Sequence, residues 1–182
     1  MNRIQPVDRH TTHDRLRTTF DAVEKQLGVV PNMVRTMAVS PAVLEGYLGL
    51  LAALGRGALA PALREQIALA TAEANACDYC LSAHTALARR AGVAENELDA
   101  NRAGLSSDPK VAAALRFVSK VIERRGGVSD VALADVRAAG FPDGEIAEIV
   151  AHVALNTFTN YFNRVARTEI DFPRVTARTV AA

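Results

Sequence analysis

Apolar side chains recur at intervals of three and four residues along most of the chain, which is the spacing of helices that bury one face. Thr11 or Thr12 is expected to cap a first helix that ends at Gly28. Its predicted core positions are Leu16, Phe20, Val23 and Leu27. A later helix, capped by Ser107-Asp108-Pro109, should turn Val111, Leu115, Val118 and Ile122 inward.

Proline, glycine and capping residues divide the rest of the chain into further helices. We expect them over 32–38, 43–54, 61–74, 94–103, 109–124 and 129–139, with a last long helix from Pro142 to about Arg167. Gly46 and Gly49 would allow close approach of another helix, including one from a second subunit. We therefore predict one all-α domain over 1–182, with 1–10 and 174–182 as loose arms.

Composition and charge narrow the function classes. Hydrophobic residues make up 49% of the chain, aromatic residues only 5%, and Trp is absent, which favours close-packed helices over a sheet. A net charge of +1 gives no electrostatic reason to expect nucleic acid or an anionic membrane as a partner. The N-terminus lacks a signal pattern, and the apolar run 43–54 is too short to span a bilayer. We expect a cytoplasmic protein, where a C-x-x-C pair is more often catalytic than structural.

The candidate chemistry lies between Glu65 and Gly92. This stretch holds the only two cysteines, Cys77 and Cys80, and His84 follows Cys80 by four residues. In one straight helix Glu65 would lie about 18 Å from Cys77 along the axis, too far to touch either sulfur. Asn75, a good cap residue, separates two apolar helical runs, so we expect the chain to reverse there.

That reversal would have chemical consequences. It sets Glu65 level with His84 across two antiparallel helices and places both cysteines at the start of the second helix. Free backbone amides and the helix dipole favour a thiolate there. Cys80 and His84 share a helix face, and Glu65 could orient the imidazole and accept its proton. The pattern predicts a nucleophile, a second thiol, a relay imidazole and a carboxylate.

The spacing E-x11-C-x-x-C-x3-H, with the CDYC sequence at 77–80, resembles the core motif of the AhpD-type alkylhydroperoxidases in the carboxymuconolactone decarboxylase family. The resemblance is strongest over 61–98 and looks like the peroxidase-related branch further upstream. It implies an AhpD-like helical fold, a homo-oligomer, and reduction of hydrogen peroxide or alkyl hydroperoxides through a disulfide cycle without a cofactor or metal. A lipoylated or thioredoxin-like dithiol protein would be the reductant. Family branches that act as decarboxylases lack the C-x-x-C pair.

The resemblance also implies residue roles. Cys80 would attack the peroxide, Cys77 would resolve the product, and Glu65 and His84 would relay protons. One departure is Tyr79, because the founding enzymes have His between the cysteines. Since a tyrosine hydroxyl is a poor base at neutral pH, the relay would depend on Glu65 and His84 alone.

Other interpretations stay open. The thiols could be buried apolar groups, or Cys77, Cys80, His84 and Glu65 could hold zinc. The dithiol could also serve as a disulfide carrier or redox sensor with little peroxidase activity, or be incidental in an oligomer that binds a small apolar ligand. The last helix carries a polar row of His152, Asn156, Asn160 and Asn163, with Tyr161 and Arg164 nearby. We favour a seam between helices or protomers, or a solvent face, over a part in the thiol pocket, and leave the row out of the predicted site.

Overall fold

The computed structural model describes residues 2–9 and 11–178, and within these ranges the chain forms nine α-helices and no strand. In chain order they are α1 Asp14–Leu27, α2 Asn32–Met37, α3 Pro41–Gly55, α4 Pro61–Ala74, α5 Asp78–Arg90, α6 Glu95–Arg102, α7 Pro109–Glu123, α8 Asp130–Ala138 and α9 Asp143–Ala166. The predicted all-α fold class is confirmed.

Local cap chemistry explains why the helix boundaries lie close to the expected ones. Gly28 ends α1 with a left-handed φ of 85°, a conformation that costs glycine little. Asp108 and Ser129 accept backbone amides at the starts of α7 and α8. The start of α1 differs from the prediction, because the helix begins at Asp14 without a side-chain cap rather than at a capping threonine.

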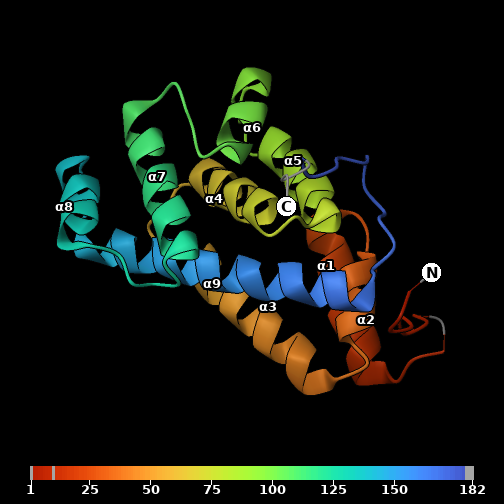
Figure 1. Ribbon diagram of the computed structural model, residues 1–182. Coiled ribbons are helices and arrows are strands. Elements are labelled where there is room, and N and C mark those ends of the chain that lie inside the picture. The colour runs from red at the N-terminus through yellow and green to blue at the C-terminus, as the bar shows by residue number, and fades with distance from the viewer. Residues whose placement is uncertain (1, 10, 179–182) are drawn as a thin grey trace.

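Helix α4 lies at the centre of the molecule and packs against α5, α6, α7 and α9 (Figure 1). Its burial is almost continuous around the helix, and a helix that is buried on all sides belongs inside a larger assembly of helices. The buried residues are Leu63, Gln66, Ile67, Ala68, Leu69, Ala70, Thr71, Ala72 and Glu73. Ile67 and Leu69 have no exposed surface, and such burial stabilises the fold by about 1.5–3 kcal/mol per side chain.

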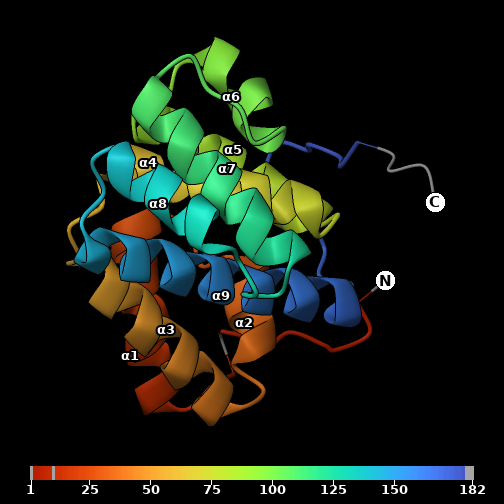
Figure 2. The same ribbon diagram turned by 60° about the vertical axis from the view of Figure 1, so that its left-hand side comes forward.

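Helix α9 runs between two parts of the fold, with α4 and α7 on one side and α1 and α3 on the other (Figures 1 and 2). One apolar cluster joins α4, α7 and α9 and includes Ile67, Leu115, Val118 and Ile149. A second joins α1, α2 and α3 and includes Phe20, Val23, Val34, Met37 and Leu44. Of the predicted core positions, Phe20, Val23, Leu115 and Val118 are buried, whereas Leu16, Leu27, Val111 and Ile122 are partly buried.

The described parts of the two expected arms are attached to the helices rather than loose. The Arg3 amide donates to the Ala166 carbonyl at 2.7 Å. At the other end, the Val175 amide donates to the Ser82 hydroxyl at 2.9 Å. The amino-acid composition could not predict these hydrogen bonds, because backbone amides donate them. Residues 1, 10 and 179–182, to which the same expectation applied, lie outside the described residues. In the described ranges no helix is both long and apolar enough to cross a membrane.

Candidate active site

The chain reverses between α4 and α5 through a compact helix-ending motif. The Cys77 amide donates to the Ala72 carbonyl and the Ala76 amide to the Glu73 carbonyl, each at 3.0 Å. This pair of bonds is the Schellman pattern, and Ala76 takes the left-handed position with a φ of 49°. The same Cys77 is also the N-cap of α5. One cysteine therefore ends the first helix and begins the second.

The two sulfurs lie side by side in the protein interior. Cys77 Sγ and Cys80 Sγ are 2.9 Å apart, and both residues are at most 2% exposed. The Cys80 amide donates to Cys77 Sγ at 3.4 Å, which fixes Cys77 as the cap of α5. Because a disulfide bond is about 2.05 Å long, the sulfurs need to approach by only about 0.9 Å to join.

The surroundings shift the pKa values of the two thiols in opposite directions. A hydrogen bond from the Cys77 thiol lowers the pKa of Cys80 to about 6. Burial opposes this change, while the charge of His84 and donors from Asn163 and Asn160 support it. The hydrogen bond to Cys80 and burial raise the pKa of Cys77. Cys80 is thus the thiolate at neutral pH, and Cys77 keeps its proton.

Glu65 and His84 form the pair expected across the reversal. His84 Nδ1 and Glu65 Oε2 are 2.8 Å apart, and each side chain is about one-fifth exposed. Burial alone would lower the pKa of His84, but the charge of Glu65 and its hydrogen bond outweigh it and raise that pKa. The imidazolium therefore persists to higher pH than in a free histidine, and it lies one helical turn after Cys80.

The polar row on α9 combines both interpretations of the sequence, because part of it faces this site and Asn160 forms a seam between helices. Asn163 Nδ2 donates to Cys80 Sγ at 3.3 Å and to Met33 Sδ at 3.1 Å. Asn160 accepts a hydrogen bond from Asn75 at 2.9 Å, so it ties α9 to the reversal. His152 lines the same cavity as the thiolate. Sequence reasoning missed Asn163; the signal was its helical spacing with His152, Asn156 and Asn160.

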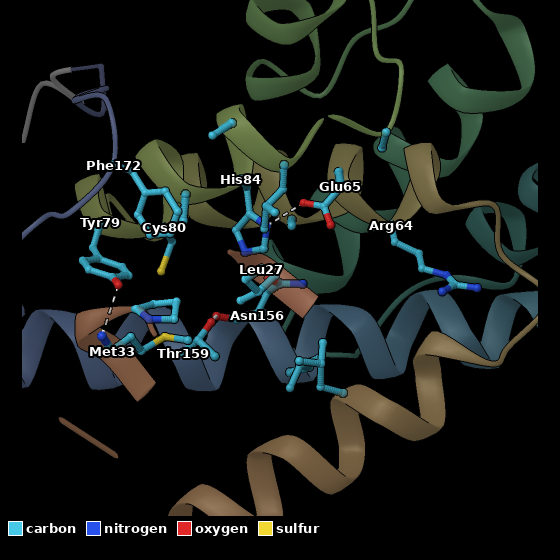
Figure 3. Close-up of a pocket in the computed structure, with 18 of the residues that line it drawn as sticks. Leu27, Met33, Arg64, Glu65, Tyr79, Cys80, His84, Asn156, Thr159 and Phe172 are labelled. Carbon is cyan, nitrogen blue, oxygen red and sulfur yellow. Dashed lines mark hydrogen bonds and ion pairs between the residues drawn. The ribbon is translucent and has the colours of Figure 1, made fainter. Parts of the chain in front are cut away.

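Tyr79 is placed in the cavity wall and not in the relay. Its hydroxyl accepts the Met33 amide at 3.1 Å, and its ring contacts Phe172 edge to face (Figure 3). Burial raises the pKa of Tyr79, so the hydroxyl keeps its proton. The side chain therefore attaches α2 to α5 and contributes no base.

A cavity of about 300 Å³ opens onto Cys80 and the Glu65–His84 pair. Figure 3 shows Cys80 on one side of this cavity, the His84–Glu65 pair in the middle and Arg64 on the other side. Its wall is mainly apolar, with contributions from Leu27, Met33, Val34, Tyr47, Leu51, Ala83, Leu87, Leu155 and Phe172. A pocket of this volume accommodates an organic molecule and is much larger than hydrogen peroxide requires.

Comparisons with known proteins were consistent with the motif. The sequence profile described as "Carboxymuconolactone decarboxylase family" matches residues 41–123. The structure aligns, with a TM-score of 0.84 and 26% identity, with an AhpD-core, peroxidase-related protein of Ralstonia eutropha, covering 93% of this chain and 92% of that one. Over residues 41–123 the chain is therefore similar to the carboxymuconolactone decarboxylase family. Among curated proteins, no sequence matches it.

Other solved structures share this fold. A peroxidase-related protein of a Silicibacter species has a TM-score of 0.81 at 22% identity, covering 92% of each chain. The debrominase Bmp8 has a TM-score of 0.79 at 23% identity, covering 93% of this chain and 92% of that one. A further structure of that debrominase contains 2,3,4-tribromopyrrole. At these identities the likeness establishes the fold alone.

The nitrogen and sulfur atoms of the predicted site are engaged by neighbouring side chains. His84 Nδ1 is occupied by Glu65, and Cys80 Sγ is held by Cys77 and Asn163. Among the described residues, no group of three or more His, Cys, Asp and Glu side chains is arranged to hold a metal ion.

Proposed function

We propose that this protein is a thiol-dependent peroxidase that reduces hydrogen peroxide or alkyl hydroperoxides through a disulfide between Cys77 and Cys80. The observation that carries the proposal is the pairing of the two buried sulfurs, 2.9 Å apart, beside the His84–Glu65 pair. AhpD-like, peroxidase-related proteins share the fold.

The first half of the proposed cycle breaks the peroxide bond. The Cys80 thiolate attacks one oxygen of the peroxide, so an S–O bond forms as the O–O bond breaks. The departing oxygen takes a proton from the His84 imidazolium and leaves as water or an alcohol. Cys80 is oxidised to a sulfenic acid, and the peroxide is reduced by two electrons. Glu65 holds the imidazole by Nδ1, which leaves Nε2 to exchange protons with the cavity.

The second half closes and reopens the disulfide. The Cys77 sulfur displaces the sulfenic hydroxyl, which leaves as water, and Cys77 gives up its proton through the His84–Glu65 pair. A dithiol reductant, such as a lipoylated or thioredoxin-like protein, then returns two electrons and two protons. Each turnover converts one peroxide and one external dithiol into water, an alcohol or second water, and one external disulfide.

Turnover by cysteine variants tests this function. Cys80→Ser should abolish peroxidase turnover, because no thiolate remains at the end of the cavity. Cys77→Ser should consume one peroxide per chain and leave a sulfenic acid, which dimedone labelling and mass spectrometry detect. Retained turnover in Cys80→Ser would exclude the assignment. A wild-type protein that exchanges with dithiols but reacts with peroxide no faster than free cysteine would instead be a disulfide carrier or redox sensor.

A second candidate is reductive dehalogenation of a haloaromatic compound, favoured by the large apolar cavity and its aromatic wall. In that reaction the ring carbon gains a proton, the halogen passes to Cys80 sulfur, and Cys77 displaces it as halide while the disulfide forms. The arene is reduced and the dithiol oxidised, each by two electrons. Stoichiometric bromide release from 2,3,4-tribromopyrrole by reduced protein would support this reaction over peroxide reduction.

The expected homo-oligomer is also a proposal, and α3 and α9 carry surfaces that suit it. Exposed apolar side chains occur on α3 at Leu50 and Leu51 and on α9 at Phe158, Tyr161 and Val165. Helix α3 has a single fully buried residue, Leu44, although most of its residues are apolar. Burying such faces against a second copy removes apolar surface from water. Sedimentation velocity should show a species larger than 19.4 kDa.

A further inference from the structure

The cavity at Cys80 has an uneven distribution of charge along its length. Its ionisable lining residues include Glu65 and His84, which pair with each other, and two arginines, Arg64 and Arg90. In the part of the chain that the structure describes, neither arginine forms an ion pair with a carboxylate. The cavity thus has the thiolate of Cys80 at one end and two arginines without a direct ion-pair partner elsewhere in its wall.

Both arginines are held in place by backbone carbonyls and not by acids. Arg64 donates to the Gly55 and Gly57 carbonyls at 2.8 and 3.0 Å. Arg90 donates to the Leu27 carbonyl at 3.3 Å. A guanidinium has five N–H donors, so each arginine keeps donors for a ligand. Glu148 lies at the same loop without a direct ion pair to Arg64: its oxygens accept the amides of Ala58 and Leu59, and these hydrogen bonds, with a smaller effect of the Arg64 charge, lower its pKa.

The arginines lie away from the sulfurs. Cys77 and Cys80 occupy the reversal between α4 and α5, whereas Arg64 and Arg90 lie toward the open end of this helix pair, near the start of α4 and at the end of α5. Ten residues of helix separate Cys80 from Arg90, which corresponds to about 15 Å along the axis. Figure 3 shows Cys80 and Arg64 on opposite sides of the His84–Glu65 pair.

From this arrangement we propose that the cavity binds organic substrates that carry a carboxylate, with the carboxylate at Arg64 and Arg90, an apolar body along the wall, and the reducible group at Cys80. Hydrogen peroxide has neither an apolar body nor an anionic group, so it uses only the sulfur end. The substrate class is a hydroperoxide of a medium-length carboxylic acid. This assignment of the reducible group rests on the proposed peroxidase function, whereas the binding of the carboxylate does not.

Binding of unreactive ligands tests the carboxylate separately from peroxide chemistry. Octanoate and octan-1-ol have the same chain length and differ in charge, and calorimetry with reduced full-length protein would give both dissociation constants. We expect octanoate to bind about tenfold more tightly, because charge-assisted hydrogen bonds at a partly exposed site contribute about 1.4 kcal/mol. The preference should shrink as ionic strength rises. Equal affinities, or no binding of either ligand, would overturn the inference.

Variants show whether the two arginines cause the preference. Arg64→Gln and Arg90→Gln should each reduce the preference for octanoate over octan-1-ol, and the double variant should abolish it. Arg64→Lys keeps the charge and guards against loss of the loop contacts, so it should retain part of the preference. Arg56→Gln removes an exposed arginine outside the cavity and should leave the preference intact. An unchanged preference in the double variant would refute the proposed site. Steady-state assays with 8-hydroperoxyoctanoate and its methyl ester should show a lower KM for the acid, and equal KM values would overturn the assigned substrate class. No turnover of either compound, with intact octanoate binding, would fault the peroxidase function alone.

Discussion

Replacing Asn163 by leucine removes one hydrogen-bond donor from the Cys80 sulfur while keeping a side chain of similar size. The donor is 3.3 Å from the sulfur, and the Asn163 Oδ1 atom is buried without a partner in the structure. Hydrogen bonds to a charged group are worth about 1.5–3 kcal/mol, which corresponds to about one to two pH units. Asn163→Leu should therefore raise the pKa of Cys80 from about 6 to about 7 or 8.

The assay is the rate of Cys80 alkylation by iodoacetamide as a function of pH, followed by mass spectrometry. Thiolate is the reactive form, so the rate rises as pH increases through the pKa and then levels off. At pH 7 the variant should react about two to ten times more slowly than wild type, and the difference should vanish at high pH. Thr159→Val is a matched control, because its hydroxyl bonds the Asn156 carbonyl and not sulfur. An unchanged alkylation midpoint in Asn163→Leu would refute the role of this donor.

Three further predictions concern the relay and the frame that holds it. Glu65→Gln should slow turnover about 10²- to 10⁴-fold without changing the fold, because His84 loses its carboxylate partner. A coupled peroxidase assay measures the rate and circular dichroism checks the fold. An unaltered rate would remove Glu65 from the relay. The pH profile of turnover should rise through the lowered pKa of Cys80 and fall above the raised pKa of His84, so a profile that rises only near the pKa of free cysteine would contradict the site electrostatics. Ala76→Gly should stabilise the protein by about 0.5–1 kcal/mol in urea unfolding, because Ala76 has a left-handed φ of 49°; a destabilised variant would show that the reversal carries no such strain.

The helices were predictable from the sequence because local signals and burial agreed. Proline starts at Pro41, Pro61 and Pro109, a glycine stop at Gly28 and a regular apolar spacing each act within a few residues. The reversal at Asn75 was predictable for a different reason, since Asn75 is a good cap residue that separates two apolar helical runs. Once the reversal was assumed, helix geometry alone set Glu65 beside His84.

The rest of the site depends on contacts between distant parts of the chain. Asn163 reaches Cys80 across 83 positions of sequence, and nothing local distinguishes it from a polar residue on a helix seam. Tyr79 was a departure from the family pattern, but only the structure shows that its hydroxyl accepts the Met33 amide. The sequence could not predict that the two cavity arginines lack an ion-pair partner, because ion pairing depends on how distant parts of the chain pack.

The most direct test of the account is a single-turnover reaction of fully reduced protein with one equivalent of hydrogen peroxide, or of an alkyl hydroperoxide, in a stopped-flow instrument. We expect a second-order rate well above that of free cysteine at pH 7, consumption of one peroxide per chain, and a Cys77–Cys80 disulfide as the product in peptide mapping. Thiols that remain reduced, or that oxidise no faster than free cysteine, would contradict the central claim that this helix reversal builds a peroxide-reducing dithiol.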